Sequence, residues 1–377
     1  MHKKYSMYHS SSQHRRKSFR VLIVVAVLLL MVAALSRPLG SAAKIPAATK
    51  SDAPRQQAIT SKDGVWRSID QKDISDQARP GAPRAYRTLS LDRVRLARIL
   101  AAAPLEFSKA KTNQVELTLP LADGAYQSFR VVESPIMKPA LAAKYPDIRT
   151  YRGQSLDDAS TITRFDWTPN GFHALILSSE GTVLIEPYAP NDQDNYIVYF
   201  QRDVPVTSVE CDVSEAEQEA AFEKTKASDK LSPQVFSGAN LRTYRLAVGA
   251  TAEYTQTYGA GSVAGGLSAV TTTVNFVDAI YERDVAIRLM LVANEDSIIY
   301  TDSATDGYTS DNASALINEN QTKLDSIIGS ANYDIGHVFD GRSQGGGFSF
   351  QGVAALGVVC RDGLKARGVS ITRSVSP

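Results

Sequence analysis

Side chains that could carry out chemistry are few in this sequence, and their spacing excludes most kinds of site. The 377 residues include five histidines: His2, His9, His14, His173 and His337. No two of them are four residues apart, the spacing that turns two imidazoles toward one metal from a single helix face. A zinc site needs three or four converging ligands, so the sequence predicts none. His173 and His337 are interpreted as hydrogen-bonded structural residues.

Two glycine-containing motifs have the form of functional turns. Residues Gly341–Gly345 follow the G-x-S-x-G pattern of a serine nucleophile, but the histidine base of that fold comes after the serine, and none follows His337. Residues Gly259–Gly261 have the form of a phosphate-binding turn before a helix, but the third glycine is displaced to Gly265. Both motifs are therefore predicted to be structural loops.

The cysteine count and the charge balance exclude several classes of protein. The two cysteines, Cys211 and Cys360, are too few for a small disulfide-held fold or a multi-cysteine zinc site. Exported cysteines often pair, so a Cys211–Cys360 disulfide is one possibility. The 41 basic and 40 acidic residues nearly balance, which argues against a nucleic-acid-binding protein.

The N-terminus has the order of a secretory signal. Basic residues up to Arg20 precede an unbroken apolar run, Val21–Leu35, and small residues follow at Ser41–Ala43. As a helix the apolar run would extend about 22 Å, short of the ~30 Å that crosses a hydrocarbon core. We therefore expect residues 1–43 to be a signal, the protein to be secreted, and no stable membrane span beyond the signal. An uncleaved N-terminal anchor is the alternative.

The region after the signal is expected to begin with a spacer and a short helix. Residues 44–83 are polar with scattered prolines, and we interpret them as the spacer. A helix is predicted from Ser90 to Ala102, with Leu91, Val94 and Leu100 facing inward.

Residues 84–211 are predicted to form a compact antiparallel β domain. Short apolar runs alternate with polar neighbours, and turn signals such as Asp123-Gly124 and Asn170-Gly171 separate them. The strands expected from this pattern are Val115–Leu119, Phe129–Val132, Thr161–Trp167, Phe172–Leu177, Val183–Ile185 and Tyr196–Phe200.

A charged, apolar-poor segment, residues 212–240, is predicted to be an acidic linker at a domain boundary. Beyond it, over residues 241–377, the elements follow the order β-α-β-α-β-β, which predicts a mostly parallel α/β sheet. The chain as a whole is therefore expected to be α+β. The strands expected here are Leu241–Val248, Ala286–Ala293, Tyr333–Phe339 and Gly352–Cys360, and the helices are Ser262–Arg283 and Asn312–Ile328.

Both halves of the chain resemble a known family over roughly Arg84 to Val369. The second half resembles the first part of the catalytic domain of reprolysin-like zinc metalloproteases, in the metzincin group. The first half is similar to the prodomain of bacterial members. The matching stretches of the second half are Tyr244–Val248, Val274–Val277, Ile287–Val292, Tyr333–Phe339, Gly352–Cys360 and Lys365–Val369. Those of the first half are Glu133–Met137, Ala142–Pro146, Arg164–Asp166, Thr168–Pro169 and Gly171–His173.

The resemblance implies the precursor of a zinc-dependent metalloendopeptidase that hydrolyses peptide bonds in protein or peptide substrates. The family holds its zinc with H-E-x-x-H-x-x-G-x-x-H, whose glutamate acts as a general base on the bound water. That motif does not occur in residues 1–377, so no catalytic and no metal-ligating residue is carried over. We therefore expect a precursor truncated before its catalytic helix, inactive as given, with a prodomain at 84–211 and a partial catalytic domain at 241–377.

What the resemblance assigns is a substrate-binding edge strand. In the family, the matching strand pairs with the extended backbone of the substrate, and an edge strand presents unpaired N–H and C=O groups that a peptide can satisfy. The corresponding residues here are Ala354, Ala355, Leu356, Gly357, Val358 and Val359.

The resemblance also bears on the cysteines and leaves a second function open. It implies that Cys360 pairs with a cysteine outside residues 1–377, which would leave a free thiol here. Cys211 is a candidate switch cysteine that would occupy the zinc of a latent enzyme, although its neighbours match no latency motif. The alternative function is a complete secreted protein that binds peptides or a partner without catalysis.

The predicted second half has only two crossover helices, and Ser370–Pro377 suggests neither helix nor strand. A parallel sheet normally needs both faces covered. We therefore expect some apolar strand residues to remain exposed among Ile287, Leu289, Leu291, Ile335 and Val338.

Overall fold

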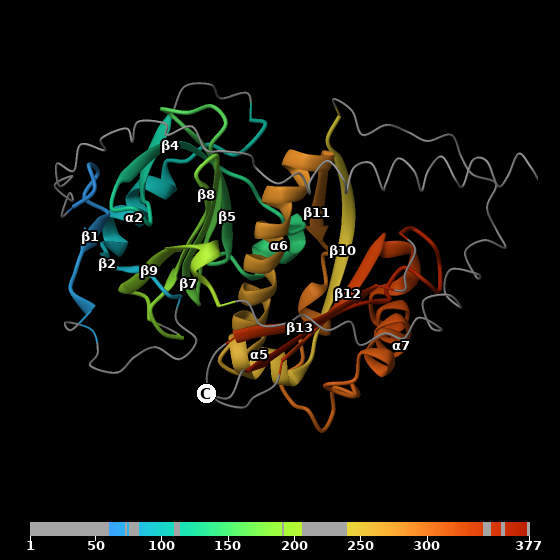
Figure 1. The fold of residues 1–377 in the computed structure, drawn as a ribbon. Helices are drawn as coiled ribbons and strands as arrows, with labels where there is room; N and C mark the ends of the chain where they lie inside the picture. The colour runs from blue at the N-terminus through green and yellow to red at the C-terminus, as the bar shows by residue number, and fades with distance from the viewer. Residues whose placement is uncertain are drawn as a thin grey trace, which may run out of the picture. The chain divides into compact units, whose positions relative to one another are not determined.

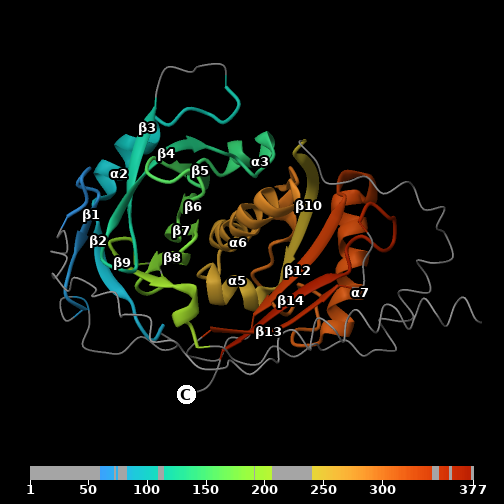
Figure 2. The ribbon, with the colours of Figure 1, turned by 45° about the horizontal axis from the view of Figure 1, so that its top comes forward.

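A computed structural model describes residues 60–71, 74, 83–108, 114–190, 192–205, 240–341, 348–355 and 359–374. The described residues form an α+β protein with two β-sheets (Figures 1 and 2). We call residues 60–205 the N-terminal half and residues 240–374 the C-terminal half. The predicted signal and nearly all of the predicted linker lie outside the described residues.

The N-terminal half is a nine-stranded antiparallel sheet, which we call sheet A. Its order is β1-β2-β9-β8-β7-β6-β5-β4-β3, so strands β3 to β9 form a meander and β9 then pairs with β2. Gly124, Gly171 and Gly181 adopt positive φ of 103°, 113° and 126° at three of the hairpin turns, a conformation that favours glycine. The strands are β1 Trp66–Ser68, β2 Arg87–Leu91, β3 Val115–Pro120, β4 Tyr126–Glu133, β5 Arg149–Ser155, β6 Ile162–Thr168, β7 Gly171–Ser178, β8 Gly181–Pro187 and β9 Asn195–Phe200.

Helix α2 (Arg93–Ala101) packs on the core face of sheet A. The helix begins after Asp92, whose side chain accepts a hydrogen bond from the Arg95 N–H at 2.9 Å, and not at Ser90 as predicted. Leu96 and Leu100 are buried, four residues apart on one face. The predicted inward position of Val94 is wrong, because the inward face is set by those two leucines and Val94 is 69% exposed.

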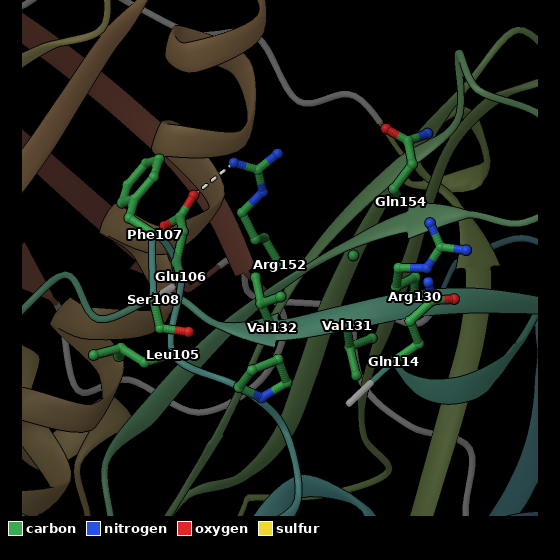
Figure 3. Close-up of a pocket in the computed structure, with 12 residues that line it drawn as sticks. Leu105, Glu106, Phe107, Ser108, Gln114, Arg130, Val131, Val132, Arg152 and Gln154 are labelled. Carbon is green, nitrogen blue, oxygen red and sulfur yellow. Dashed lines mark hydrogen bonds and ion pairs between the residues drawn. The ribbon is translucent and has the colours of Figure 1, made fainter. Parts of the chain in front are cut away.

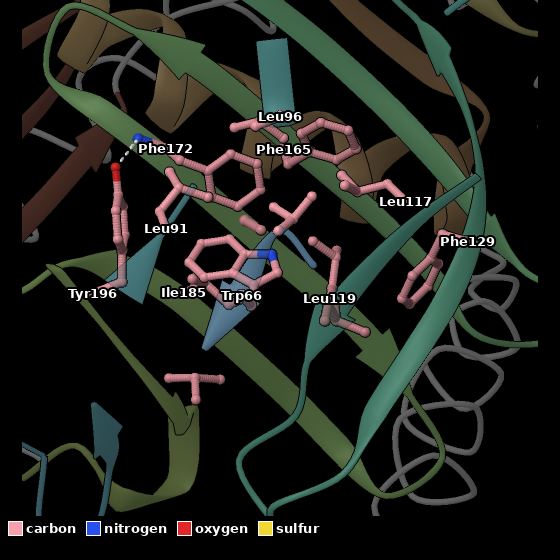
Figure 4. Packing of buried hydrophobic residues seen from close by; sticks show 14 of the residues in the cluster. Trp66, Leu91, Leu96, Leu117, Leu119, Phe129, Phe165, Phe172, Ile185 and Tyr196 are labelled. Atoms are coloured by element: carbon pink, nitrogen blue, oxygen red, sulfur yellow. Dashed lines mark hydrogen bonds between the residues drawn. The ribbon is translucent and has the colours of Figure 1, made fainter. Parts of the chain in front are cut away.

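Residues 60–69 belong to the β domain, although the sequence suggested a spacer there. Trp66 in β1 is fully buried between Phe172 and Tyr196, edge-to-face with both and with ring centroids 5.3 Å apart in each pair (Figure 4). The Asp63 carboxylate accepts a hydrogen bond from the Thr118 N–H at 2.7 Å, which joins the two ends of the sheet. The strand is only three residues long, too short to show a period in the sequence.

The C-terminal half contains a five-stranded sheet, sheet B, with the order β11-β10-β12-β14-β13. Neighbouring strands are parallel except β13, which runs antiparallel to β14. The strands are β10 Arg242–Ala250, β11 Ile287–Leu291, β12 Ile335–Gly341, β13 Phe348–Ala355 and β14 Gly368–Ser374. The helices are α5 Ala252–Tyr258, α6 Val263–Val285 and α7 Ala313–Leu324, with α3 Pro139–Lys144 contributed by the N-terminal half.

Three expectations about sheet B need correction. The strand predicted at Gly352–Cys360 is β13 in the structure, which begins four residues earlier than predicted. Val359 and Cys360, which were predicted to end this strand, lie in a turn. Residues 368–374, for which no strand was predicted, form β14 in the interior of the sheet. Ile327, predicted to face inward, is 39% exposed because α7 continues as a π-helical turn, Asp325–Gly329, which shifts the helical period.

The apolar strand residues of sheet B are better covered than expected. Leu289, Leu291 and Val338 are buried, while Ile287 and Ile335 are half-buried. Helix α6 and residues of the N-terminal half, Ile136 and Met137 among them, cover the β10–β11 side. Helix α7 covers Val338. The prediction of an open patch failed because it counted only helices of the second half.

Helix α6 is the one described helix that is long and apolar enough to cross a membrane by length and composition. Its leucine and valine side chains at Leu267, Val270 and Val274 are buried in the protein core. Core helices pass the same test, so α6 is accounted for as the core helix between the two sheets.

Trp66→Ala should lower the free energy of unfolding by about 3–5 kcal/mol, because it leaves a large cavity in the aromatic core. Urea denaturation followed by far-UV circular dichroism would measure the loss. Arg67→Ala, one residue along the same strand and exposed, is the control and should change stability by less than about 0.5 kcal/mol. A loss below about 1 kcal/mol for Trp66→Ala would show that residues 60–69 are not part of the core.

Candidate functional site

Strand β13 lies at one end of sheet B, where the sequence predicts a substrate-binding edge. Among the described residues it pairs only with β14, and Ala354 lies opposite Val369 while Ala355 lies opposite Gly368. Of the predicted edge residues, these two alanines are in β13 and Val359 is exposed in the following turn. Residues 356–358 lie outside the described part of the chain. The substrate-binding role of residues 354–359 therefore stays a prediction.

His337 on β12 occupies a structural position. Its Nε2 lies 2.9 Å from the Ser370 Oγ on β14, and its ring contacts Phe339 edge-to-face at 5.3 Å. A side chain at Gly368 would collide with the imidazole, since a Cβ there would be 2.4 Å from Nδ1. Burial lowers the pKa of His337 to about 4, so the ring is neutral at pH 7.

His173 on β7 lies against the buried carboxylate of Asp166. The His173 Nδ1 is 3.2 Å from Asp166 Oδ1, and the Thr272 hydroxyl of α6 donates to the same oxygen at 2.9 Å. Burial raises the pKa of Asp166, and the neighbouring imidazole opposes this effect. His173 is on sheet A and His337 is on sheet B, so the two rings do not converge.

The described residues do not fit a zinc ion. No group of three histidine, cysteine, aspartate or glutamate side chains within them is arranged to hold a metal. The two described histidines are both engaged in hydrogen bonds, as predicted. We therefore derive no catalytic step through zinc from this part of the chain.

The glycine motifs also behave as structural elements where they are described. Residues Gly259–Gly261 link α5 to α6, and a Cβ at Gly265 would lie 2.0 Å from the Gly259 carbonyl oxygen. The glycines thus permit the close approach of two backbones, and the phosphate-binding interpretation is not needed. Gly341 ends β12, and the rest of the G-x-S-x-G motif lies outside the described residues.

A chain of alternating charges crosses the contact between the two halves. Glu106 accepts hydrogen bonds from both Arg152, at 2.6 Å, and Arg288, at 2.8 and 3.1 Å. Arg288 also pairs with Glu282 on α6, and Glu282 accepts a second bond from Arg164 at 2.6 Å. All but Arg152 are largely buried. Removing one member would leave a buried charge without compensation, which is strongly destabilising.

The arginines favour the charged form of these carboxylates. Burial alone would raise the pKa of Glu106, but hydrogen bonds from Arg288 and Ser134 overcome it and lower the pKa to about 2. The pKa of Glu282 is lowered in the same way, against its burial, by Arg288 and Arg164. Sequence analysis missed this network because its members are far apart in the chain. The one local signal was Arg288, the single charged residue in the otherwise apolar strand Ile287–Leu291.

The N-terminal half also adds backbone to the edge of sheet B. The Leu291 N–H donates to the Ile136 carbonyl at 2.7 Å, and the Lys138 N–H donates to the Leu291 carbonyl at 3.1 Å. Met137 thus forms a parallel β-bridge with Leu291, the last residue of β11. This bridge lies at the opposite end of the sheet order from β13.

A pocket of about 510 Å³ lies next to the charge network, between residues 104–108 and strands β4 and β5 (Figure 3). Glu106 and Arg152 pair on its wall, and the exposed Arg130 lies further along β4. Phe107 is 78% exposed and has a φ of 62°, an uncommon conformation for an aromatic residue. The pocket has no arrangement of nucleophile and base.

Comparison with known proteins identifies the C-terminal half. Residues 240–376 match the family model described as Metallo-peptidase family M12B Reprolysin-like. This part of the chain is thus similar to the reprolysin-like metallopeptidases. The resemblance stated from the sequence for the second half is thereby confirmed at the level of the family, and the prodomain resemblance of the first half stays a prediction. No curated protein matches the chain.

Among solved structures, the chain is similar to metalloproteinase-II from Bacteroides fragilis. The identity is 10%, the TM-score is 0.33, and the match covers 74% of this chain and 78% of that one. The reprolysin-like segment includes all of sheet B together with helices α5, α6 and α7.

Asp278 on α6 should make stability depend on pH. Burial raises its pKa to about 7, although its Oδ1 accepts a hydrogen bond from the Leu289 N–H at 2.8 Å. Because the folded protein holds this proton more tightly than the unfolded chain, stability falls as the pH rises from the ordinary range of an aspartate through about 7. Between about pH 5 and pH 8 the loss from this group is roughly 2–3 kcal/mol.

Asp278→Asn should reduce the fall in stability over this pH range by about that amount, as measured by urea denaturation at several pH values, while the buried Asp166 and Glu295, whose pKa values burial also raises, keep their own contributions. Asp284→Asn is the control, since Asp284 is an exposed acid on the same helix whose pKa is lowered by Arg283. An unchanged pH profile in Asp278→Asn would show that another group titrates in this range.

Cys360 should react as a free thiol. It is exposed, with a φ of 61°, and its N–H donates to the Asp334 carbonyl at 2.8 Å. Cys211 lies outside the described residues, so the alternative of a Cys211–Cys360 disulfide stays open. Partial burial and the nearby Asp334 carboxylate raise the pKa of the Cys360 thiol, so alkylation should be faster at a pH above its ordinary value near 9. Intact mass after alkylation without reductant should show the adduct; a mass unchanged until reductant is added would establish the disulfide.

Proposed function

We propose that this chain is the precursor form of a secreted zinc-dependent metalloendopeptidase. The observation that carries the proposal is the reprolysin-like match over residues 240–376. Members of this family of metallopeptidases depend on zinc and act on peptide bonds, so protein or peptide substrates and a zinc cofactor are assigned with it. The signal-like order of residues 1–43 supports export.

In this proposal the two halves have different roles. Residues 84–211 serve as a prodomain and residues 212–240 as the linker where maturation cuts the chain. Residues 241–377 supply the substrate side of the catalytic domain, with the edge at 354–359 binding the peptide backbone. The zinc ligands are not among these residues, since the sequence contains no H-E-x-x-H.

A second function is favoured by one observation. Sheet B has an edge strand, β13, in a stretch of chain that contains no zinc-binding motif. An edge strand binds an extended peptide by backbone hydrogen bonds without any catalysis. The alternative is therefore a secreted protein that binds peptides or a partner protein and does not hydrolyse them.

Zinc content and peptide hydrolysis separate the two functions. The protein as its gene encodes it should contain about one zinc per chain after dialysis, and a chelator should abolish its cleavage of an unfolded protein substrate. Residues 1–377 alone should bind no zinc stoichiometrically and cleave nothing. If the gene product also lacks tight zinc but binds peptides, the non-catalytic function replaces the protease.

A further inference from the structure

The contact between the two halves follows most of the length of helix α6. Near its beginning, the Asn170 side chain donates to the carbonyls of Tyr258 and Gly265, at 3.0 Å each. Near its end, Arg164 donates to Glu282 at 2.6 Å. From Gly265 to Glu282 an α-helix rises about 25 Å, so these two contacts fix the position of the helix on sheet A.

In the middle of the same contact, a buried side-chain amide is hydrogen-bonded through both its nitrogen and its oxygen. Asn275 on α6 is fully buried, its Nδ2 donates to the Phe165 carbonyl at 3.0 Å, and its Oδ1 accepts from Arg164 at 2.9 Å. Beside it, Leu175 and Leu177 of β7 pack against Ala279. To satisfy the buried Asn275 amide, the surface that packs against it must offer both a hydrogen-bond donor and a hydrogen-bond acceptor.

A third contact is made by backbone at β11. The Ile136–Lys138 segment adds one β-bridge at Leu291, the end of β11, and Ile136, Met137 and Leu141 are buried against the strands and α6. The two backbone hydrogen bonds follow the pattern by which a separate peptide binds to the edge of a sheet, over one residue pair. The β13 edge, beyond which no further strand is found in the described part of the chain, lies at the opposite end of the sheet from β11.

The charge network adds selectivity to these contacts. Arg288 lies between Glu106 of one half and Glu282 of the other, and it is 6% exposed. A buried ion pair adds little net stability, but any partner that lacks the matching charge leaves a buried ion unpaired. The surface of α6 and β11 therefore accepts the N-terminal half and discriminates against other apolar surfaces.

We propose that the α6–β11 surface is a binding site whose ligand is the N-terminal half as a separate chain. After a cut between the halves, the N-terminal half stays bound as a non-covalent subunit, attached away from the β13 edge. The β-bridge at Leu291 and the buried contacts of α6 provide the affinity, and the Glu106–Arg288–Glu282 network provides the selectivity. The proposal does not depend on zinc or on catalysis by the complete enzyme.

The test is a cut made after folding. A recognition site for a specific protease is placed within residues 212–240 of the full 377-residue chain, the folded protein is cut to completion, and the products are separated by size-exclusion chromatography. The two fragments should elute together at the volume of the uncut chain, also in about 0.5 M salt, because buried charges are screened little. Two separate peaks would overturn the proposal.

Variants of the charge network test the selectivity. In the cut protein, Arg288→Met should weaken the association by at least about 100-fold, because Glu106 and Glu282 both lose a buried partner. Adding Glu106→Gln to Arg288→Met should recover about tenfold of that loss, since one uncompensated charge is removed. Arg283→Met is the matched control, because Arg283 on α6 is exposed and pairs with its neighbour Asp284. Strictly additive effects would refute a selective role for the network.

Hydrogen exchange on the unmutated protein covers the case in which a variant does not fold. The amides of Lys138 and Leu291, which form the bridge between the halves, should exchange equally slowly before and after the cut. Fast exchange at both amides after the cut, with slow exchange maintained in β10, would show that the N-terminal half has left and would also overturn the proposal.

Discussion

Helix α6 packs against both sheets at once, and the rest of the structure depends on this constraint. Its Leu267, Val270 and Val274 side chains enter the core with sheet B, while Thr272 and Asn275 bond to sheet A. A helix with two buried sides has little room for charged residues that are not paired. This explains why Asp278 bonds to the Leu289 amide and why Glu282 lies between two arginines.

The same constraint makes the halves one unit, although a charged segment separates them in sequence. The described residues of the two halves pack as one compact unit, and sheet A covers a side of α6 that would otherwise be exposed. At the end of β11, Met137 adds one parallel β-bridge to Leu291, so the N-terminal half also meets sheet B through backbone. The N-terminal half thus acts as a structural complement of the reprolysin-like segment.

The two ends of sheet B therefore differ in what contacts them. At β11 the N-terminal half contacts the sheet, through two backbone hydrogen bonds at Leu291 and through buried apolar side chains. At β13 the pairing within the described residues stops. If the proposed protease function holds, the substrate meets the sheet at the end that the N-terminal half leaves uncovered, and latency requires a different contact from the one at α6.

The sequence by itself determined the elements that have a local signal. The regular spacing from Val263 to Val277 predicts α6, and the hairpin glycines predict most of the meander in sheet A, because helical period and turn conformation are properties of short segments. The family of the second half was also recognisable, because each matching stretch in β10, β11 and β12 is an unbroken run of residues. Val94 and Ile327 were misplaced because the true helix start and a π-helical turn shift the period.

Only the tertiary structure decided which surfaces meet. Glu106, Arg164, Glu282 and Arg288 lie up to 182 residues apart, and no local pattern relates one to another. Trp66 belongs to a strand too short for a period, and β14 was missed although it lies inside sheet B. Burial and pairing depend on the summed packing of distant segments, so the partner of each buried charge, and the open end of the sheet, could be known only from the folded chain.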